Sequence, residues 1–143
     1  MTISYEVDSE RHRLITVWMG SATFEEVLRH IKNRAAENTL CFPQLIDARK
    51  ARVAFSTADV DRIVSAMKIH AQEKTLPPTA IVAGCELDFG MFRMFGSLAD
   101  DAYLVNVFRS CEAARQWLGW EDDHRIDITG PTLHRRGAIK RFS

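Results

Sequence analysis

The chain has 143 residues, of which 46 % are hydrophobic and 27 % are charged, a composition typical of one globular domain. Its 19 lysines and arginines balance its 19 aspartates and glutamates, so no overall field attracts it to nucleic acid, and we expect no nucleic-acid partner. No apolar run reaches transmembrane length and the first ten residues do not resemble a signal peptide. We therefore expect a cytoplasmic protein without membrane insertion.

The residues that most often carry metal or thiol chemistry are scattered. Cys41, Cys85 and Cys111 lie far apart and form no C-x-x-C pair, and the five histidines show no metal-ligand spacing. We find no nucleophile elbow, no phosphate-binding glycine loop and no paired-carboxylate motif. We therefore expect no metal, no cofactor and no catalytic residue, and an uncharacterised enzyme is the third candidate function, after the two given below.

The first part of the chain predicts a β-hairpin followed by a helix. Residues 3–7 alternate apolar and polar side chains, and residues 12–19 are a second β-rich run. Thr23 and Glu26 then have the spacing of a capping box, which indicates a helix that begins near Thr23.

Strands and helices then alternate. Residues 44–48 predict a short strand, which a basic loop connects to a helix that begins at Ser56. Three further elements follow as a strand buried on both faces, a helix and a strand, at residues 79–84, 86–101 and 103–108. A last helix, between Ser110 and Gly119, completes the order β-β-α-β-α-β-α-β-α of an α/β domain.

The chain divides into a domain, residues 1–119, and an extension, residues 120–143. The extension falls outside the alternating pattern, yet it contains Trp120, Ile126, Ile128 and Leu133. These apolar side chains need partners, so we expect the extension to pack on its own domain or on a partner subunit.

The order of elements resembles the SpoIIAA-like fold of STAS domains, especially small stand-alone bacterial proteins of that group. The resemblance is carried by "ISYEVDSERHRLITVWMGSATFEEVL", "LIDARKARVAFSTADV", "AIVAGCELDFGMFRMFGSLADDA" and "VNVFRSCEAARQWLG". It implies a single-wound mixed sheet with helices mainly on one face, and a distant kinship with CRAL-TRIO lipid-binding domains. In the resembling signalling proteins, a partner kinase phosphorylates a serine near the start of the helix after the third strand, the approximate position of Ser56.

Ser56 has two interpretations. With Asp59 it has the S-x-x-D form of a helix cap, and we favour that role. The alternative is a phosphoswitch or an anion site that Ser56 forms with the cations of the preceding loop, which are Arg49, Lys50 and Arg52. A solvated basic loop would explain these cations equally well.

The helix expected at residues 86–101 has an apolar arc of roughly 220°, wider than one sheet face needs. The surplus can lie under a neighbouring helix, in a homodimer interface or around an apolar ligand. The candidate interaction or ligand face comprises Phe89, Met91, Phe92, Met94 and Phe95.

We interpret the chain as a non-catalytic STAS-like interaction or regulatory module, and we expect a homodimer that could also have another protein partner. The alternative is a small binding protein or sensor for an apolar or anionic ligand.

Overall fold

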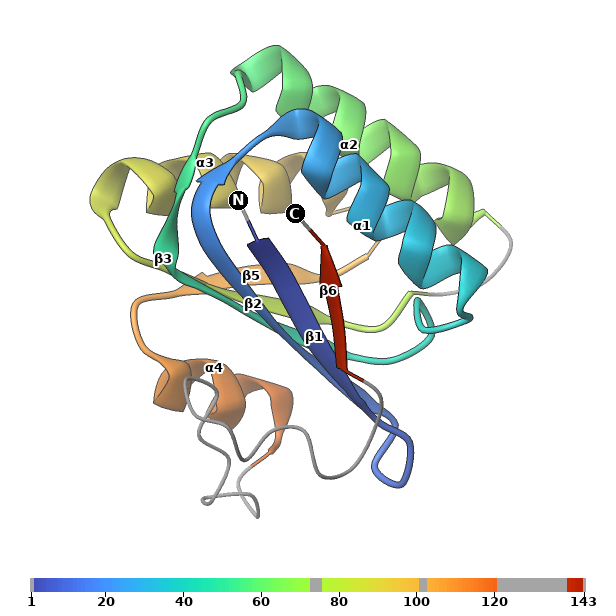
Figure 1. Cartoon of the computed structure of the whole chain (residues 1–143). Helices are drawn as coiled ribbons and strands as arrows, with labels where there is room; N and C mark the ends of the chain where they lie inside the picture. Colours follow the sequence, from blue (N-terminus) through green and yellow to red (C-terminus); the bar gives the residue numbers. More distant parts are fainter. Residues whose placement is uncertain (1, 73–75, 101–102, 121–138, 143) are drawn as a thin grey trace.

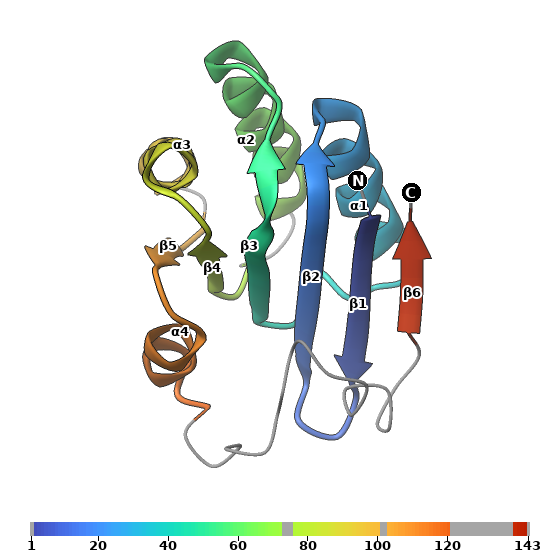
Figure 2. The same cartoon turned by 60° about the vertical axis from the view of Figure 1, so that its left-hand side comes forward.

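One six-stranded mixed sheet organises the molecule, whose computed structural model describes residues 2–72, 76–100, 103–120 and 139–142 (Figure 1). The strand order is β5-β4-β3-β2-β1-β6 (Figure 2). Neighbours from β2 to β5 are parallel, whereas β1 is antiparallel to both β2 and β6. The strands are β1 Thr2–Asp8, β2 Arg13–Ala22, β3 Gln44–Val53, β4 Thr79–Ala83, β5 Val105–Phe108 and β6 Ile139–Phe142.

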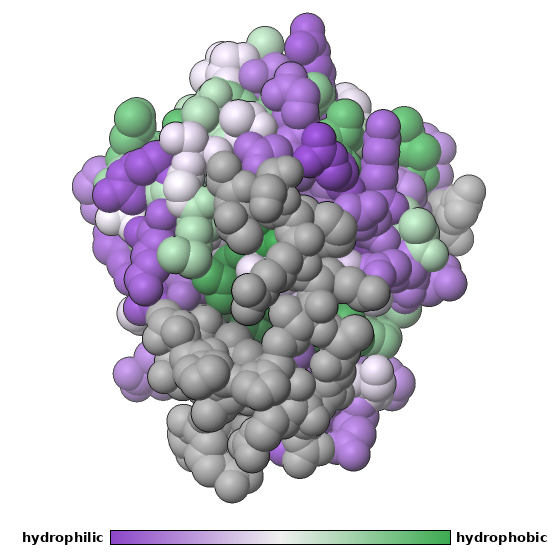
Figure 3. Space-filling view, in the orientation of Figure 1, coloured by the Kyte–Doolittle hydropathy of each residue, from purple (hydrophilic) through white to green (hydrophobic). Residues whose placement is uncertain are grey.

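Four helices cover the two faces of the sheet unequally. Helices α1 (Phe24–Ala36), α2 (Thr57–Ala71) and α3 (Glu86–Ala99) lie on one face, and α4 (Cys111–Leu118) lies on the other (Figure 1). The predicted order of nine elements is thus confirmed, and the four-residue strand β6 follows it. In Figure 3, α1 and α2 present mainly hydrophilic residues to solvent, as amphipathic helices do.

The sheet separates two hydrophobic cores. The larger core lies under α1, α2 and α3, and the smaller one lies under α4. Strand β4 is buried along its whole length, as the continuous apolar run predicted. Its Ile81 belongs to the larger core and its Ala80 and Val82 to the smaller one. Side chains of this central strand therefore contribute to both cores.

The basic stretch after residue 48 is a strand and not the predicted loop. Strand β3 continues to Val53 because β2 is ten residues long and offers it backbone partners throughout. The register shifts after the Val17–Asp47 pair and resumes at Met19–Lys50, so β3 carries one extra residue. This bulge interrupts the alternation of faces, and consecutive Arg49 and Lys50 are both exposed.

The bulged part of β3 also packs against the backbone at the end of β4. A Cβ atom added to Gly84 would lie 2.2 Å from the carbonyl oxygen of Arg49. This atom belongs to the backbone and cannot rotate away, so only glycine fits at position 84 without a shift of the strands.

We expect Gly84→Ala to lower the free energy of unfolding by about 2 kcal/mol or more, because it overpacks two adjacent strands. Gly90→Ala is the matched control, since a Cβ at this exposed position in α3 meets nothing within 4 Å. Alanine is the better helix former, so the control should gain about 0.5–1 kcal/mol. Urea unfolding measures the change in free energy for both variants. Equal changes would contradict the close approach of Gly84 to the carbonyl oxygen of Arg49.

Candidate functional site

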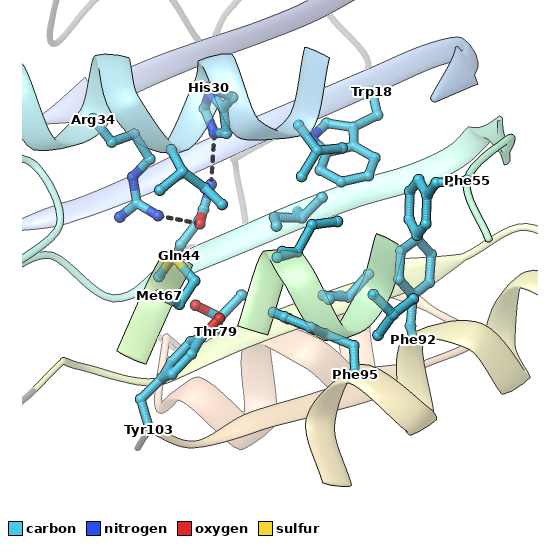
Figure 4. Close-up of a pocket in the computed structure, with 16 residues that line it drawn as sticks. Trp18, His30, Arg34, Gln44, Phe55, Met67, Thr79, Phe92, Phe95 and Tyr103 are labelled. Atoms are coloured by element: carbon cyan, nitrogen blue, oxygen red, sulfur yellow. Dashed lines mark hydrogen bonds between the residues drawn. The ribbon is translucent and has the colours of Figure 1, made fainter. Parts of the chain in front are cut away.

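A cavity of about 60 Å³ lies between the sheet and helices α1, α2 and α3, and it is partly open to solvent (Figure 4). A buried water needs only about 10–15 Å³, so the cavity has room for more than one small molecule of that size. Most of its wall is apolar, but one part carries polar side chains. The lining residues are Trp18, Val27, His30, Ile31, Arg34, Gln44, Ile46, Phe55, Val60, Ile63, Met67, Thr79, Ile81, Phe92, Phe95 and Tyr103.

Arg34 is the charged residue of this wall, and α1 places it there. The buried positions of α1 are Val27, His30, Ile31 and Arg34, which recur at the spacing of one helix face. Two of the four are polar, so the face that α1 turns to the core is only half apolar. The side chain of Arg34 is consequently buried and only 5 % exposed.

The guanidinium of Arg34 donates to uncharged acceptors. Its Nη1 donates to Gln44 Oε1 at 2.5 Å, and its Nη2 donates to the carbonyl oxygens of Thr39 at 2.9 Å and Phe42 at 3.4 Å. No carboxylate of the described residues forms an ion pair with Arg34. Burial lowers the pKa of Arg34 to about 10, so at neutral pH the core contains a cation for which the described residues provide no counter-ion.

The contact with Arg34 also orients Gln44 and sets the protonation of His30. A guanidinium has no acceptor, so the amide oxygen of Gln44 must face it and the amide nitrogen must face away. That nitrogen, Nε2, donates to Thr16 Oγ1 at 2.6 Å and lies 3.5 Å from His30 Nε2. His30 Nε2 is therefore the acceptor, and the imidazole proton resides on Nδ1.

His30 is neutral in the folded protein. Burial lowers its pKa to about 3, and the charge of Arg34 acts in the same direction. The imidazole packs edge-on against Tyr5 at 5.3 Å between ring centroids, and the Tyr5 hydroxyl donates to Glu37. Aromatic packing on one side and Gln44 on the other thus hold the His30 ring in place.

Three residues of the cavity wall each have a buried nitrogen atom that lacks a hydrogen-bond partner within the part of the chain that the structure describes. These atoms are Trp18 Nε1, His30 Nδ1 and Arg34 Nε. In Figure 4, these three residues follow one another along the wall formed by β2 and α1. A buried donor without a partner costs about 1–3 kcal/mol, so such groups are rare and call for an explanation.

Thr79 and Tyr103 lie across the cavity from α1 (Figure 4). Burial raises the pKa of Tyr103, and the charge of Arg34 opposes this shift, so the phenol keeps its proton. The ring of Tyr103 packs edge-on against Phe95 at 6.2 Å between centroids. The cavity therefore has a polar part near Arg34 and an aromatic part formed by β2, α2 and α3.

The candidate residues of helix α3 divide between the cavity and its surroundings. Phe92 is buried and Phe95 is half-buried, and both line the cavity. Phe89, Met91 and Met94 are half-buried and pack against the larger core. The wide apolar arc is explained in part by α2, against which α3 packs in addition to β4 and β5.

Ser56 is the N-cap of α2, as predicted. Its Oγ accepts from Asp59 N at 3.1 Å, and Asp59 Oδ2 accepts from Ser56 N at 3.0 Å, which completes a capping box. Phosphorylation of this exposed serine stays a prediction.

The basic residues proposed for an anion site make local contacts in β3. Arg49 binds Asp47 through two hydrogen bonds of 2.8 and 2.9 Å, and Arg52 donates to the carbonyl oxygen of Ala51 at 2.7 Å. Lys50 is exposed. Two of the three cations thus bond to groups of their own strand, and an anion site at Ser56 stays a prediction.

The polar residues of the cavity were not among the sequence-based candidates. A signal was present, because His30 and Arg34 occupy the apolar stripe of α1 three and seven residues after Val27. Within the described residues there is no group of three or more histidines, cysteines, aspartates or glutamates that could hold a metal ion. The described helices include none that is long and apolar enough to cross a membrane.

Comparison with solved structures shows that the chain has a SpoIIAA-like fold. A similar structure is that of an uncharacterised protein of the DUF3478 family from Shewanella loihica PV-4, described as having a SpoIIAA-like fold. The TM-score is 0.52 at 18 % sequence identity, and the match covers 74 % of this chain and 83 % of that one. No protein-family model and no curated protein sequence matches the chain. The similarity establishes the fold and leaves the function to be argued from the site.

The low pKa of His30 predicts that stability falls in mild acid. The unfolded chain takes up a proton at His30 as the pH drops below about 6.5, whereas the folded chain does so only near pH 3. The stability that neutral His30 contributes should thus be present above pH 6.5, and the free energy of unfolding should decrease by about 2 kcal/mol by pH 5. Urea unfolding at a series of pH values measures this decrease.

His30→Gln is the control, because glutamine can donate and accept hydrogen bonds but does not titrate. The variant should lose most of the decrease between pH 6.5 and pH 5, whatever its stability at neutral pH. The same pH profile in both proteins would show that His30 is not held neutral by the fold.

Proposed function

We propose that the chain is a non-catalytic binding module for a small ligand, which occupies the cavity between the sheet and helices α1, α2 and α3. The observation that carries the proposal is that three residues lining the cavity, Trp18, His30 and Arg34, each have a buried nitrogen atom for which the described part of the chain offers no hydrogen-bond partner. Ligand pockets are typically apolar with a few polar groups that orient the ligand, and this cavity has that composition.

Packing alone does not account for these residues. Trp18, His30 and Arg34 are 4 %, 3 % and 5 % exposed, so solvent reaches them little. Apolar side chains of similar volume would fill the same space without leaving donors unpaired, which would favour stability. A ligand that accepts hydrogen bonds from the wall would supply the missing partners and stabilise the folded state by mass action.

We expect the neutral probe n-butanol to bind the cavity and to shift the indole N–H resonance of Trp18 saturably in ¹H–¹⁵N NMR spectra. Ile63→Phe should abolish this shift, because Ile63 is 4 % exposed and lines the cavity, so the larger ring fills it. The overpacking should cost about 1–3 kcal/mol, so folding of the variant is checked by circular dichroism.

Ile69→Phe is the matched control on the same helix, since Ile69 is 63 % exposed and is not part of the cavity wall. This variant should bind the probe like the wild type. A ligand-binding role is contradicted if neither n-butanol nor any of the probes used below shifts the Trp18 resonance of the wild type saturably.

A protein-interaction role is the second candidate, and an apolar stripe on α3 favours it. Leu87, Met91, Met94 and Leu98 are spaced by four, three and four residues, which places them on one side of the helix. None of them is fully buried, and Leu87 and Leu98 are 77 % and 40 % exposed. Pairing of two copies about a two-fold axis would cover both stripes with one self-complementary surface.

We expect the wild type to sediment as a dimer at micromolar concentration and Leu87→Glu to sediment as a monomer, because a charge in the stripe cannot be buried against its copy. Ile69→Glu, at an exposed position of α2, should leave the dimer intact. A monomeric wild type would exclude the dimer, and a dimer that survives Leu87→Glu would place the interface elsewhere.

A further inference from the structure

We propose that the ligand is a short-chain monocarboxylate, whose carboxylate group accepts hydrogen bonds from Arg34 and whose apolar body lies against Phe92 and Phe95. This inference rests on the proposed ligand-binding function and assigns the chemical class of the ligand. It follows from three properties of the cavity, which are the hydrogen-bonding character of its polar wall, its charge and its volume.

The unsatisfied groups of the polar wall are all donors. Arg34 Nε and Trp18 Nε1 carry a hydrogen in every protonation state found near neutral pH. His30 Nδ1 carries one because its Nε2 faces the amide nitrogen of Gln44. Trp18 lies at the aromatic end of the cavity, where its ring packs against Phe92 at 6.1 Å between centroids (Figure 4). A ligand group near Arg34 therefore faces the donors of Arg34 and His30, and it must be rich in acceptors. A carboxylate has two oxygen atoms with about four lone pairs and no hydrogen to place, so it fits this wall.

The charge of the site selects an anion over a neutral acceptor. The guanidinium of Arg34 is buried, and its observed partners are an amide oxygen and two backbone carbonyls. A carboxylate would provide the counter-ion and form charge-assisted hydrogen bonds, which are about twice as strong as neutral ones. A primary amide of the same shape would bring two further donors to a wall that already has a surplus. An ammonium group would be repelled.

The rest of the cavity sets the size and polarity of the body. Phe55, Phe92 and Phe95 lie at the end of the cavity away from Arg34 (Figure 4), and they offer no hydrogen-bonding groups. The volume of about 60 Å³ is less than half of the roughly 150 Å³ of an engineered cavity that binds benzene. The body is therefore a short aliphatic chain that extends into the open side of the cavity, and a fatty-acid chain does not fit.

The test compares three probes of nearly equal shape with the purified full-length protein. Butyrate, butyramide and n-butylammonium differ in charge and in donors but share one aliphatic chain. We expect butyrate to bind with a dissociation constant about tenfold or more below that of butyramide, as measured from the Trp18 indole resonance. No binding is expected for n-butylammonium. Among acetate, butyrate and octanoate, octanoate should bind weakest.

Arg34→Gln is the matching variant, because glutamine keeps a donor and removes the charge. It should reduce the preference for butyrate over butyramide to within about twofold while butyramide still binds. Arg93→Gln, at an exposed position of α3, should change neither affinity. If Arg34→Gln does not fold, the comparison of butyrate, butyramide and n-butylammonium with the wild type still tests the carboxylate assignment.

The outcomes separate the two proposals. If butyramide binds as tightly as butyrate, the carboxylate assignment is wrong and the ligand-binding module stands. If the preference for butyrate persists in folded Arg34→Gln, another group recognises the carboxylate and the assignment to Arg34 is wrong. If n-butanol, butyrate and butyramide all fail to bind, both proposals are wrong.

Discussion

The burial of one guanidinium between helix α1 and the sheet governs the arrangement of the cavity wall. Arg34 lies on the core-facing side of α1, where it bonds to the backbone carbonyls that follow α1 and to the first residue of β3. Because a guanidinium only donates, it fixes the direction of the Gln44 amide, and Gln44 in turn binds Thr16 on β2 and fixes the tautomer of His30. One charged residue thus connects a helix, a connection and two adjacent strands.

This arrangement is costly for a protein of this size. A buried cation without a counter-ion and donors without partners, as found among the described residues, reduce a stability that is only 5–15 kcal/mol for typical domains. The face under α4 also contains buried charged residues, but two of them have contacts there: Arg13 lies over the ring of Trp120, and Asp47 accepts two hydrogen bonds from the guanidinium of Arg49. On the face that contains the cavity, Arg34 has only uncharged partners among the described residues.

The sequence predicts the fold well because its local signals agree. Alternating and continuous apolar runs predicted the strands, and capping residues such as Ser56 and Ser110 marked helix starts that the structure confirms. The site was harder to predict, because the identity of a polar residue on a helix does not show whether it faces solvent or the core. Only the position of His30 and Arg34 on the stripe of Val27 and Ile31 distinguishes the two cases.

Two other features depend on long-range pairing that local patterns do not contain. Strand β3 extends beyond Ala48 because β2 is long enough to pair with it and because a bulge lies opposite Trp18. The residue types at positions 49–53 do not predict this extension. The direction of Phe92 requires the rotation of α3, which is set by its packing on α2, β4 and β5. Periodicity identified the apolar arc of α3, but tertiary contacts decide which part of the arc lines the cavity.

The most direct measurement is a crystal structure of the protein grown with butyrate and, in parallel, without it. The account predicts electron density for a carboxylate within hydrogen-bond distance of Arg34 Nε, with the aliphatic chain directed to Phe92 and Phe95. A cavity without butyrate, with Arg34 paired to a carboxylate of the chain itself, would contradict the account, because the buried charge would then be compensated by the fold.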